Sequence, residues 1–511
     1  MLAKIHSAAL AGLEAQPVTV EVDLSRGLFK FSLVGLPDAS IKEAEERVWS
    51  AMRNSDLEYP SQRITVNLAP AEVRKTGSWY DLPIALGILA ASGQVPAGAL
   101  DGTIALGELS LDGSVKAVPG VLSAALMSHH GGSGKMIVPA ENAAEAACFE
   151  GLEVYPISHL AEAASFLRGD MALEPQPVTL LSELLEKAKY ELDLSDVKGQ
   201  EHAKRALEVA AAGGHNILMM GPPGSGKTML AQRMPGILPQ LAPEEAIEVS
   251  SIYSVSGLLT GERRLMTTRP FRHPHHTISG PGLIGGGTNP QPGEISLAHN
   301  GVLFLDELME FPKSLLEQLR QPLEDGQVTI ARAQFSATFP SRFMLLAATN
   351  PCPCGYYGDA TRPCRCTAGE ILNYRKRLSG PLLDRIDIVL EVPRLPIEKI
   401  TGPGGEDSAT VRGRVQKAWE VQQHRFRHRK KQRFNSHLRP ADIEKVCALD
   451  EAGTNLLNRA HERLGLTTRG YQSIKRVART IADLDGSGAV KVSHLAEAIQ
   501  YRAGEERLRN L

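Results

Sequence analysis

The stretch Gly221-Pro-Pro-Gly-Ser-Gly-Lys227-Thr228 decides the fold of the middle of the chain. It follows the apolar run Ile217–Met220 and precedes Met229–Arg233, an order that predicts a strand, a tight loop and a helix. Glycines let successive backbone N–H groups curl around phosphate oxygens, and the helix N-terminus adds positive potential. The stretch therefore predicts a phosphate-binding loop in an α/β fold. A glycine-rich turn that merely fits the pattern is the alternative, which the flanking strand and helix disfavour.

The residues of this loop have expected contacts with ATP and Mg²⁺. Those expected to bind the nucleotide are Gly221, Pro222, Pro223, Gly224, Ser225, Gly226, Lys227 and Thr228. The Lys227 ammonium can reach the β and γ phosphate oxygens, and the Thr228 hydroxyl can ligate Mg²⁺.

A second apolar run, Val302–Leu305, ends in Asp306 and Glu307. Such a short apolar run is typical of a buried parallel strand, and the carboxyl end of that strand is where a Mg²⁺ ligand belongs. We expect Asp306 to hold the ion through water and Glu307 to orient and deprotonate the attacking water. Two acids after a strand are often an ordinary strand end, but the phosphate-binding loop upstream favours the catalytic interpretation.

A third strand is predicted at Phe343–Ala348, followed by Thr349 and Asn350. The amide of Asn350 could sense the γ-phosphate from this adjacent strand. The alternative is an asparagine that caps a loop.

Length and composition indicate a soluble protein of two to four domains, because 511 residues are too many for one hydrophobic core. The net charge of -2 means that nucleic-acid contact would need a local basic patch. We expect no membrane span and no secretory signal, and six cysteines in a chain this long do not form a disulfide framework. A cytoplasmic protein is the expectation.

The composition and hydrophobic pattern of the chain change at three places and so divide it into three regions and a linker. Residues 1–168 are expected to form an α+β domain, with strands at Val18–Val22 and Ile64–Leu68 and an apolar helix at Leu82–Ala91. Residues 169–192 are expected to be a linker, residues 193–396 a parallel α/β core and residues 397–511 a helical C-terminal lid.

These motifs together resemble the AAA+ superfamily, and more closely the YifB/ComM family of magnesium-chelatase-like ATPases. The segments that carry the resemblance are Asp196–Gln200, Phe271–Ser279, Pro292–Asn300, Asn350–Gly355 and Ser379–Asp387. The resemblance implies a ring, usually a hexamer, with each ATP site at a subunit interface and with Val197 beside the nucleotide. It also implies that Arg385 is a finger completing a neighbour's site and that Arg469 is a second sensor, with Arg476 as its nearest competitor.

The N-terminal region resembles the proteolytic domain of Lon proteases. The matching segments are Asn67–Pro70, Lys75–Gly77, Ala105–Ser110 and Ile137–Glu141. The resemblance places Asp81 at the nucleophile and Leu122 at the lysine of the Ser–Lys pair, so both catalytic positions are lost. A shifted pair of Ser78 and Lys116 is the disfavoured alternative. We expect a platform that forms the ring or faces DNA.

Four of the six cysteines form two close pairs within fifteen residues. They are Cys352, Cys354, Cys364 and Cys366. Such a set can supply a tetrahedral site for structural Zn²⁺, although the CxC spacing is less usual than CxxC. Reduced thiols without metal are the alternative. We expect His275 and His276 on a loop, as nucleic-acid or structural residues rather than as ligands.

Two segments are expected to contact DNA. Val328–Thr338 alternates like a hairpin, and it is similar to the DNA-contacting hairpin of MCM helicases, with Arg332 at the basic position. The basic run Arg425–Phe434 includes Arg429, Lys430 and Lys431, and two aromatics interleave with its charges, as phosphate tracking and base stacking require. A solvated lid helix is the alternative for this run.

A glycine-rich stretch at Gly280–Gly287 occupies the place of the helix-2 insert of related ATPases. Its composition predicts a mobile loop.

The sequence as a whole predicts an ATP-driven ring motor acting on DNA, with helicase or branch-migration activity in recombination or uptake of transforming DNA. A chelatase motor for metal insertion, a protein-remodelling ATPase and a nucleotide-gated scaffold are the alternatives.

Overall fold

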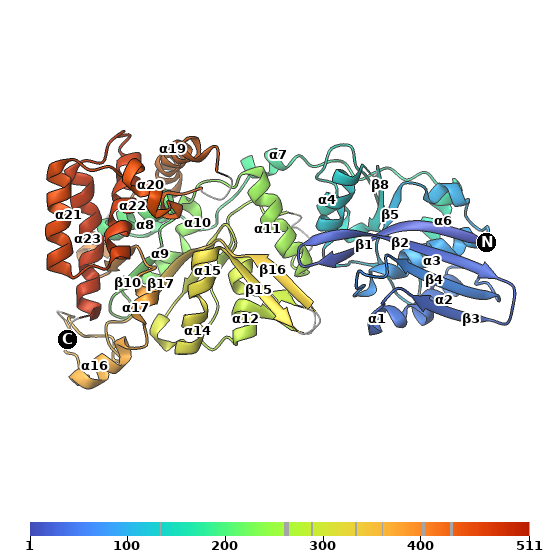
Figure 1. Cartoon of the computed structure of the whole chain (residues 1–511), viewed down its shortest axis with the longest axis horizontal. Coiled ribbons are helices and arrows are strands. Elements are labelled where there is room, and N and C mark those ends of the chain that lie inside the picture. Colours follow the sequence, from blue (N-terminus) through green and yellow to red (C-terminus); the bar gives the residue numbers. More distant parts are fainter. Residues whose placement is uncertain are drawn as a thin grey trace. The chain divides into compact units, whose positions relative to one another are not determined.

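The structure is a computed structural model, and it describes every residue except 133, 260–264, 288–289, 333–334, 360, 401–403, 430–432 and 510–511. The fold is mixed α/β, as expected, and it forms two compact units (Figure 1). The first comprises Met1–Lys187 and Pro243–Thr267, and the second comprises Ala188–Ala242 and Thr268–Leu511. A segment assigned from the sequence to the ATPase core thus packs in the first unit, where the Gly120 N–H donates to the Ser254 carbonyl at 2.9 Å.

The first unit is built on a seven-stranded mixed sheet in the order β3-β4-β2-β1-β5-β8-β9. Its strands are β1 (Leu2–Ala11), β2 (Glu14–Ser25), β3 (Lys30–Val34), β4 (Arg63–Ala69), β5 (Thr103–Ala105), β8 (Lys135–Pro139) and β9 (Glu153–Ile157), with a separate pair β6 (Glu108–Leu109) and β7 (Val115–Lys116). Its helices are α1 (Ala39–Lys42), α2 (Ala44–Asn54), α3 (Asp81–Ala91), α4 (Val121–Gly131), α5 (Ala143–Ala146), α6 (Leu160–Arg168), α7 (Leu181–Glu186) and α11 (Pro243–Val255).

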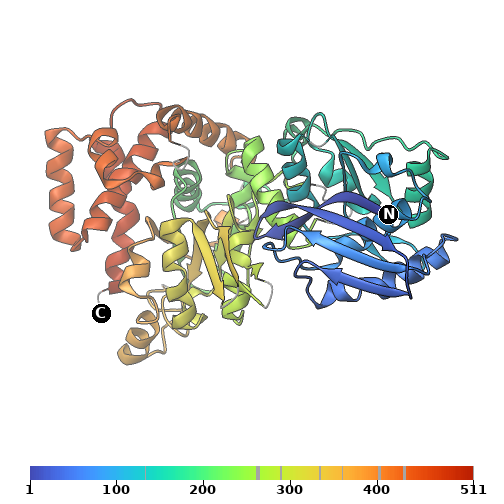
Figure 2. The ribbon, with the colours of Figure 1, turned by 45° about the vertical axis from the view of Figure 1, so that its right-hand side comes forward.

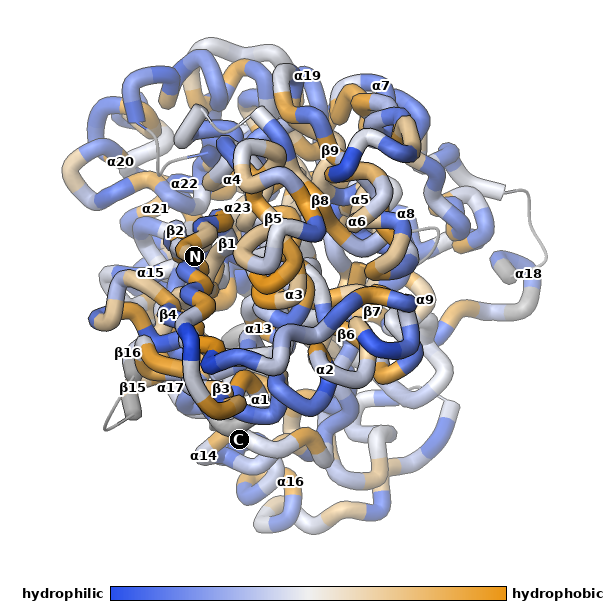
Figure 3. The backbone as a smooth tube through the Cα atoms, turned by 90° about the vertical axis from the view of Figure 1, so that its right-hand side faces the viewer, coloured by the Kyte–Doolittle hydropathy of each residue, from blue (hydrophilic) through white to orange (hydrophobic). Residues whose placement is uncertain are grey.

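The helix predicted at Leu82–Ala91 is confirmed as α3, and every residue of it is buried. Figure 3 shows α3 as hydrophobic along its length. A helix that other helices and strands surround needs no polar face, unlike a helix with one side in solvent. It packs on β1 and β2, where a Cβ at Gly87 would lie 2.6 Å from the Val22 side chain. Close packing of the helix on the sheet therefore requires glycine at this position.

The second unit is built on a five-stranded sheet in the order β11-β14-β17-β10-β18, with all neighbours parallel. Its strands are β11 (Phe271–Arg272), β14 (Val302–Leu305), β17 (Met344–Thr349), β10 (Ile217–Met220) and β18 (Ile388–Glu391), beside the pairs β12 (Gly285–Gly286) with β13 (Gln291–Pro292) and β15 (Gln327–Arg332) with β16 (Phe335–Pro340). The helices around the sheet are α8 (Glu201–Gly213), α9 (Lys227–Gln232), α10 (Met234–Ile237), α12 (Gly280–Ile284), α13 (Glu294–Leu297), α14 (Lys313–Gln318), α15 (Arg320–Asp325), α16 (Ala368–Arg375), α17 (Gly380–Leu383) and α18 (Ile397–Ile400).

The C-terminal region of this unit is helical, as predicted. Its helices are α19 (Ser408–Phe426), α20 (Pro440–Val446), α21 (Glu451–Leu464), α22 (Thr468–Leu484) and α23 (Val492–Arg509). Apolar residues of α22 and α23 join one core with those of the parallel sheet. Among the residues that the structure describes, no helix is long and apolar enough to cross a membrane.

The predicted hairpin is confirmed, and Figure 2 shows β15 and β16 side by side in the second unit. The loop predicted at Gly280–Gly287 is wrong for its first five residues, which form α12. The Ser279 hydroxyl accepts from the Gly282 N–H at 3.2 Å, and Pro281 lies in the first turn. This capping and the fixed φ of proline start a helix despite the glycines.

A buried ion pair in the first unit gives a stability prediction. Arg47 donates to both carboxylate oxygens of Asp81, at 2.6 and 2.9 Å, and the Asp81 side chain is 1% exposed. Burial raises the pKa of Asp81 to about 6 despite this partner. Arg47→Met should destabilise the unit by about 3–5 kcal/mol, because it leaves a buried carboxylate without its counter-ion. Arg168→Met, which breaks an exposed pair, should cost less than about 1 kcal/mol.

Tryptophan fluorescence during urea unfolding can measure this change. Of the three tryptophans, Trp49 and Trp79 lie in the first unit and Trp419 in the second. In a Trp419→Phe background the signal therefore reports the first unit alone. Equal unfolding midpoints for the Arg47 and Arg168 variants would contradict the role given to the buried pair.

Candidate nucleotide site and cysteine cluster

The phosphate-binding loop connects the end of β10 to the start of α9. The helix begins at Lys227, two residues earlier than the sequence indicated. Gly224 and Gly226 have φ angles of 74° and 93°, a region that glycine adopts without strain. At Gly221 a Cβ would lie 2.2 Å from the Val392 carbonyl oxygen, so the chain passes β18 too closely for any side chain.

Polar side chains from three neighbouring strands meet at this loop. The Lys227 ammonium donates to the carbonyls of Gly221 and Pro222, at 2.8 and 3.0 Å, and lies 3.4 Å from the Asn350 amide oxygen. Lys227 is largely buried, and burial lowers the pKa of its ammonium, against the opposing effect of Asp306 and Glu307. The cation thus stands where acceptor oxygens of a phosphate could replace the two carbonyls.

The expected Mg²⁺ residues are also in contact. The Thr228 hydroxyl donates to the Asp306 carboxylate at 2.7 Å, and the other oxygen of Asp306 accepts from the Glu307 N–H at 2.9 Å. Glu307 has a φ of 51°, and this left-handed conformation turns the chain sharply after β14. Its exposed carboxylate can face a water molecule while Asp306 and Thr228 share one hydrated ion.

The segment before α8 is hydrogen-bonded to the same phosphate-binding loop. The Gln200 amide donates to the carbonyls of Ser225 and Pro393, at 3.3 and 2.8 Å. Val197, three residues earlier, is buried. A cavity of about 630 Å³ borders the loop at Gly221 and Pro222 and is also lined by residues of the cysteine-bearing segment and of the chain after β18.

His276 lies beside the expected catalytic carboxylate, a placement that the sequence did not reveal. Its Nδ1 atom is 3.6 Å from Glu307 Oε2, and its ring makes an edge contact with Phe311. The two-residue strand β11 pairs with β14 in parallel and so directs the following histidines to this edge of the sheet. A strand so short has no hydrophobic period, which is why no sequence signal pointed to it.

Arg385 and Arg469 lie away from the phosphate-binding loop. Arg385 precedes β18 by three residues, and its carbonyl accepts from the Asn216 amide, just before β10 begins. Both guanidiniums contact the Glu324 carboxylate. Arg476, the alternative second sensor, is committed elsewhere, because it donates twice to the Leu438 carbonyl, at 3.1 and 2.8 Å.

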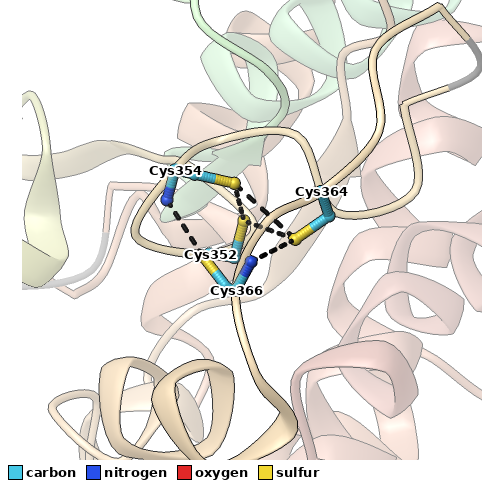
Figure 4. A group of neighbouring side chains, drawn as sticks. All are labelled: Cys352, Cys354, Cys364 and Cys366. Carbon is cyan, nitrogen blue, oxygen red and sulfur yellow. Dashed lines mark hydrogen bonds between the residues drawn. The ribbon is translucent and has the colours of Figure 1, made fainter.

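The four cysteines of the predicted cluster converge (Figure 4), with every pair of sulfur atoms within 4.8 Å. Cys352 and Cys354 are 3.4 Å apart, Cys354 and Cys364 3.6 Å, and Cys352 and Cys364 3.7 Å. Sulfur ligands of a tetrahedral Zn²⁺ at about 2.3 Å lie about 3.8 Å apart. Backbone amides of Arg365 and Tyr356 lower the pKa of the Cys354 thiol, whereas burial raises the pKa of the Cys352 thiol, so the fit to zinc rests on the geometry of the four sulfur atoms. The donor set therefore fits zinc.

The cysteine-bearing segment abuts the nucleotide loop. A Cβ at Gly355 would lie 2.6 Å from the Pro223 ring and 3.7 Å from the Asn350 side chain. Arg394, after β18, donates to the Pro223 carbonyl at 3.2 Å.

Several side chains of the basic run Arg425–Phe434 form ion pairs or are buried within the lid. Arg425 binds Asp483 through two bonds of 2.9 and 2.7 Å, and Phe426 is buried. Arg429 pairs with Asp442. Lys430 and Lys431 lie outside the described residues, and so does the side chain of Arg332, whose backbone ends β15. The structure therefore leaves the predicted DNA contacts untested.

The first unit places the residues of the Lon-like motifs as follows. The Ser78 hydroxyl donates to the Glu108 carboxylate, and Lys116 is the cross-strand partner of Glu108 in the β6–β7 pair. Asp81 binds Arg47, and Leu122 is fully buried. The hydroxyl thus has a carboxylate acceptor, and no Ser78–Lys116 hydrogen bond is found among the described residues.

A parallel sheet with this loop, this acidic strand end and a helical C-terminal region defines an ATPase with an AAA+ core. The family model described as magnesium chelatase, subunit ChlI, matches residues 193–400. Models for subunit ChlI of Mg-chelatase and for the ChlI C-terminal region match residues 20–142 and 405–502.

Similar proteins cover the whole chain. The protein YifB of Escherichia coli, called uncharacterized, is 45% identical over 100% of this chain and 99% of its own length. Competence protein ComM of Haemophilus influenzae has the same identity and coverage. Lon protease 2 of Bacillus subtilis is 28% identical over 34% of this chain and 35% of its own. The chain belongs to the YifB/ComM family of magnesium-chelatase-like AAA+ ATPases, as the sequence motifs implied.

The close approach at Gly221 gives a prediction for nucleotide binding. Gly221→Ala should weaken ATP binding by about tenfold or more, because the new Cβ must displace the loop from the Val392 carbonyl. Gly369→Ala is the control, since that glycine lies in α16 with nothing within 4 Å of an added Cβ. Calorimetric titration with ATP measures both, and equal affinities would contradict the packing argument.

Proposed function

We propose that this ATPase is a ring motor that acts on DNA, with helicase or branch-migration activity. The observation that supports it best is the division of the charged groups between two ends of one sheet. Lys227, Asp306 and Asn350 gather at the carboxyl ends of the strands, whereas Arg385 lies near their amino ends. A finger so placed acts on the nucleotide of another subunit, and closed rings satisfy every site in this way.

In this mechanism Lys227 and the loop amides bind the phosphates of ATP. Thr228 and Asp306 hold Mg²⁺, which neutralises phosphate charge when bound. Glu307 accepts the proton of the attacking water, and Asn350 orients the γ-phosphate from the neighbouring strand. Arg385 and Arg469 of an adjacent subunit stabilise the charge that develops on the transferred group.

The hairpin β15–β16 is the proposed DNA-contacting element. It follows α15 directly, and α15 carries the carboxylate that binds both arginines. A cation at Arg332 on this hairpin can bind a polyanion whose position changes with each hydrolysis step. The relative named a competence protein, ComM, supports DNA as the substrate. A metal-chelatase motor is the second candidate, and the chelatase family models favour it.

The catalytic assignment and the DNA assignment have separate tests. Lys227→Ala should lose ATP binding, whereas Glu307→Gln should bind ATP normally and lower hydrolysis by about 100-fold or more, because the ion is kept while the base is lost. Arg332→Ala should keep basal hydrolysis and lose DNA stimulation and strand displacement. ATP binding and steady-state hydrolysis are measured without DNA and with forked DNA. Full hydrolysis in Glu307→Gln contradicts the base, and stimulation by a porphyrin or protein instead of DNA contradicts the DNA substrate.

We further propose that the four cysteines hold one structural Zn²⁺ that stiffens the segment against the nucleotide loop. Purified protein should contain about one Zn²⁺ per chain by elemental analysis. Cys364→Ser with Cys366→Ser should lose the metal and weaken ATP binding, because Gly355 of the same segment supports Pro223 and Asn350. Cys447→Ser is the control, because this buried cysteine lies outside the cluster. A metal-free protein with unchanged ATP affinity would contradict the site.

A further inference from the structure

Glu324 brings together two arginines from distant parts of the second unit. Its Oε1 atom accepts from Arg385, which precedes β18, and from Arg469 at 2.5 Å, at the start of α22. The Arg385 side chain is only 9% exposed, whereas those of Glu324 and Arg469 are 44% and 52% exposed. A single carboxylate oxygen therefore holds two guanidiniums at the edge of the unit.

The register of the sheet places this cluster far from the chain's own ATP site. Ile388 pairs with Ile217 and Glu391 with Met220, so β18 and β10 begin and end together. The phosphate-binding loop follows the end of β10, while Arg385 comes before the start of β18. A strand of four residues separates the two levels by about 13 Å. Arg469 shares its acceptor with Arg385, so it lies at the same end.

The net positive charge of the cluster favours binding of an anion with more negative charge than one carboxylate. Two guanidiniums and one carboxylate carry a net charge of about +1, and the nearby Arg320 is paired with Glu317 at 2.8 Å. The half-exposed pair of Glu324 with Arg469 contributes only about 0.2–1 kcal/mol, whereas the Arg385 side of the cluster is largely buried. A triphosphate carries more charge and several acceptor oxygens, so it binds guanidinium groups more strongly than one carboxylate does.

Glu324 also lies at the base of the hairpin. The last turn of α15 ends at Gly326, whose N–H donates to the Pro322 carbonyl at 2.9 Å, and β15 begins at Gln327. A change of partner at Glu324 therefore acts on the turn from which the hairpin leaves.

We propose that Glu324 is a positioning residue that keeps Arg385 and Arg469 together as one cationic unit and gives them up to the γ-phosphate bound by a neighbouring copy of this chain. This inference rests on the proposed action of Arg385 between subunits. Before neighbours engage, Glu324 is the counter-ion of both arginines. When a neighbour presents ATP, the phosphate replaces the carboxylate, and α15 and the hairpin are released from the arginines. Subunit contact, ATP capture and hairpin position are thereby linked through one side chain.

The test compares Glu324→Gln with Glu444→Gln in the full chain. Glu444, whose side chain is 74% exposed, pairs with the buried Lys475 in the lid and serves as the control away from the two arginines. Hydrolysis is measured over a range of ATP and of protein concentrations. Glu324→Gln should lower the ATP concentration and the protein concentration that give half-maximal hydrolysis by about three- to tenfold each, because the competing carboxylate is gone. Its maximal rate should stay within about twofold of the parent's. Glu444→Gln should change neither.

Further measurements distinguish failure of this proposal from failure of the proposed action of Arg385 between subunits. Arg385→Ala alone should abolish hydrolysis, and Glu324→Gln added to it should restore nothing. If Arg385→Ala hydrolyses ATP at the parental rate, the proposed finger itself is wrong. Two results would contradict the exchange at Glu324 when Arg385→Ala is inactive. In the first, Glu324→Gln behaves like the parent. In the second, Glu324→Gln loses maximal rate but needs the same ATP and protein concentrations for half-maximal hydrolysis. Unchanged thermal unfolding of Glu324→Gln confirms that folding is not the cause.

Discussion

The parallel register of β14, β17 and β10 is the constraint on which the nucleotide site depends. Met220 pairs with Thr349 and Leu305 with Ala347, so the three strands end at nearly one level. The residues that follow them are therefore neighbours, although the sequence separates Thr228 from Asp306 by 78 positions and Lys227 from Asn350 by 123. The contacts Thr228–Asp306 and Lys227–Asn350 are direct consequences of this register.

The opposite end of the same sheet has a different use. Arg385 and Arg469 lie there and pair with the Glu324 carboxylate. Among the described residues, neither arginine has a recorded contact with the phosphate-binding loop of its own chain. A parallel sheet has distinct ends, so a site at one end and its cationic partners at the other suit head-to-tail contacts between copies. Family membership indicates oligomeric assembly, and the proposed action of Arg385 between subunits relates this polarity of the sheet to it.

Much of this organisation could be predicted from the sequence. The apolar runs before Gly221 and Asp306 set strand positions, and β14 has the predicted bounds. The four cysteines were found from spacing alone, because close pairs within fifteen residues can meet with little loop-closure cost. The glycine-rich stretch after Ser279 was predicted as a loop, and a capping hydroxyl made part of it a helix.

What the sequence by itself determined is local: the phosphate-binding loop, the acidic strand end, the sulfur cluster and the family. Only the tertiary structure decided which distant groups meet. His276 reached Glu307 through a strand of two residues, Glu324 met Arg385 and Arg469, and α11 packed with the first unit. Local patterns record the backbone's own preferences, whereas contacts between remote side chains depend on sheet order and register, which no short stretch of sequence encodes.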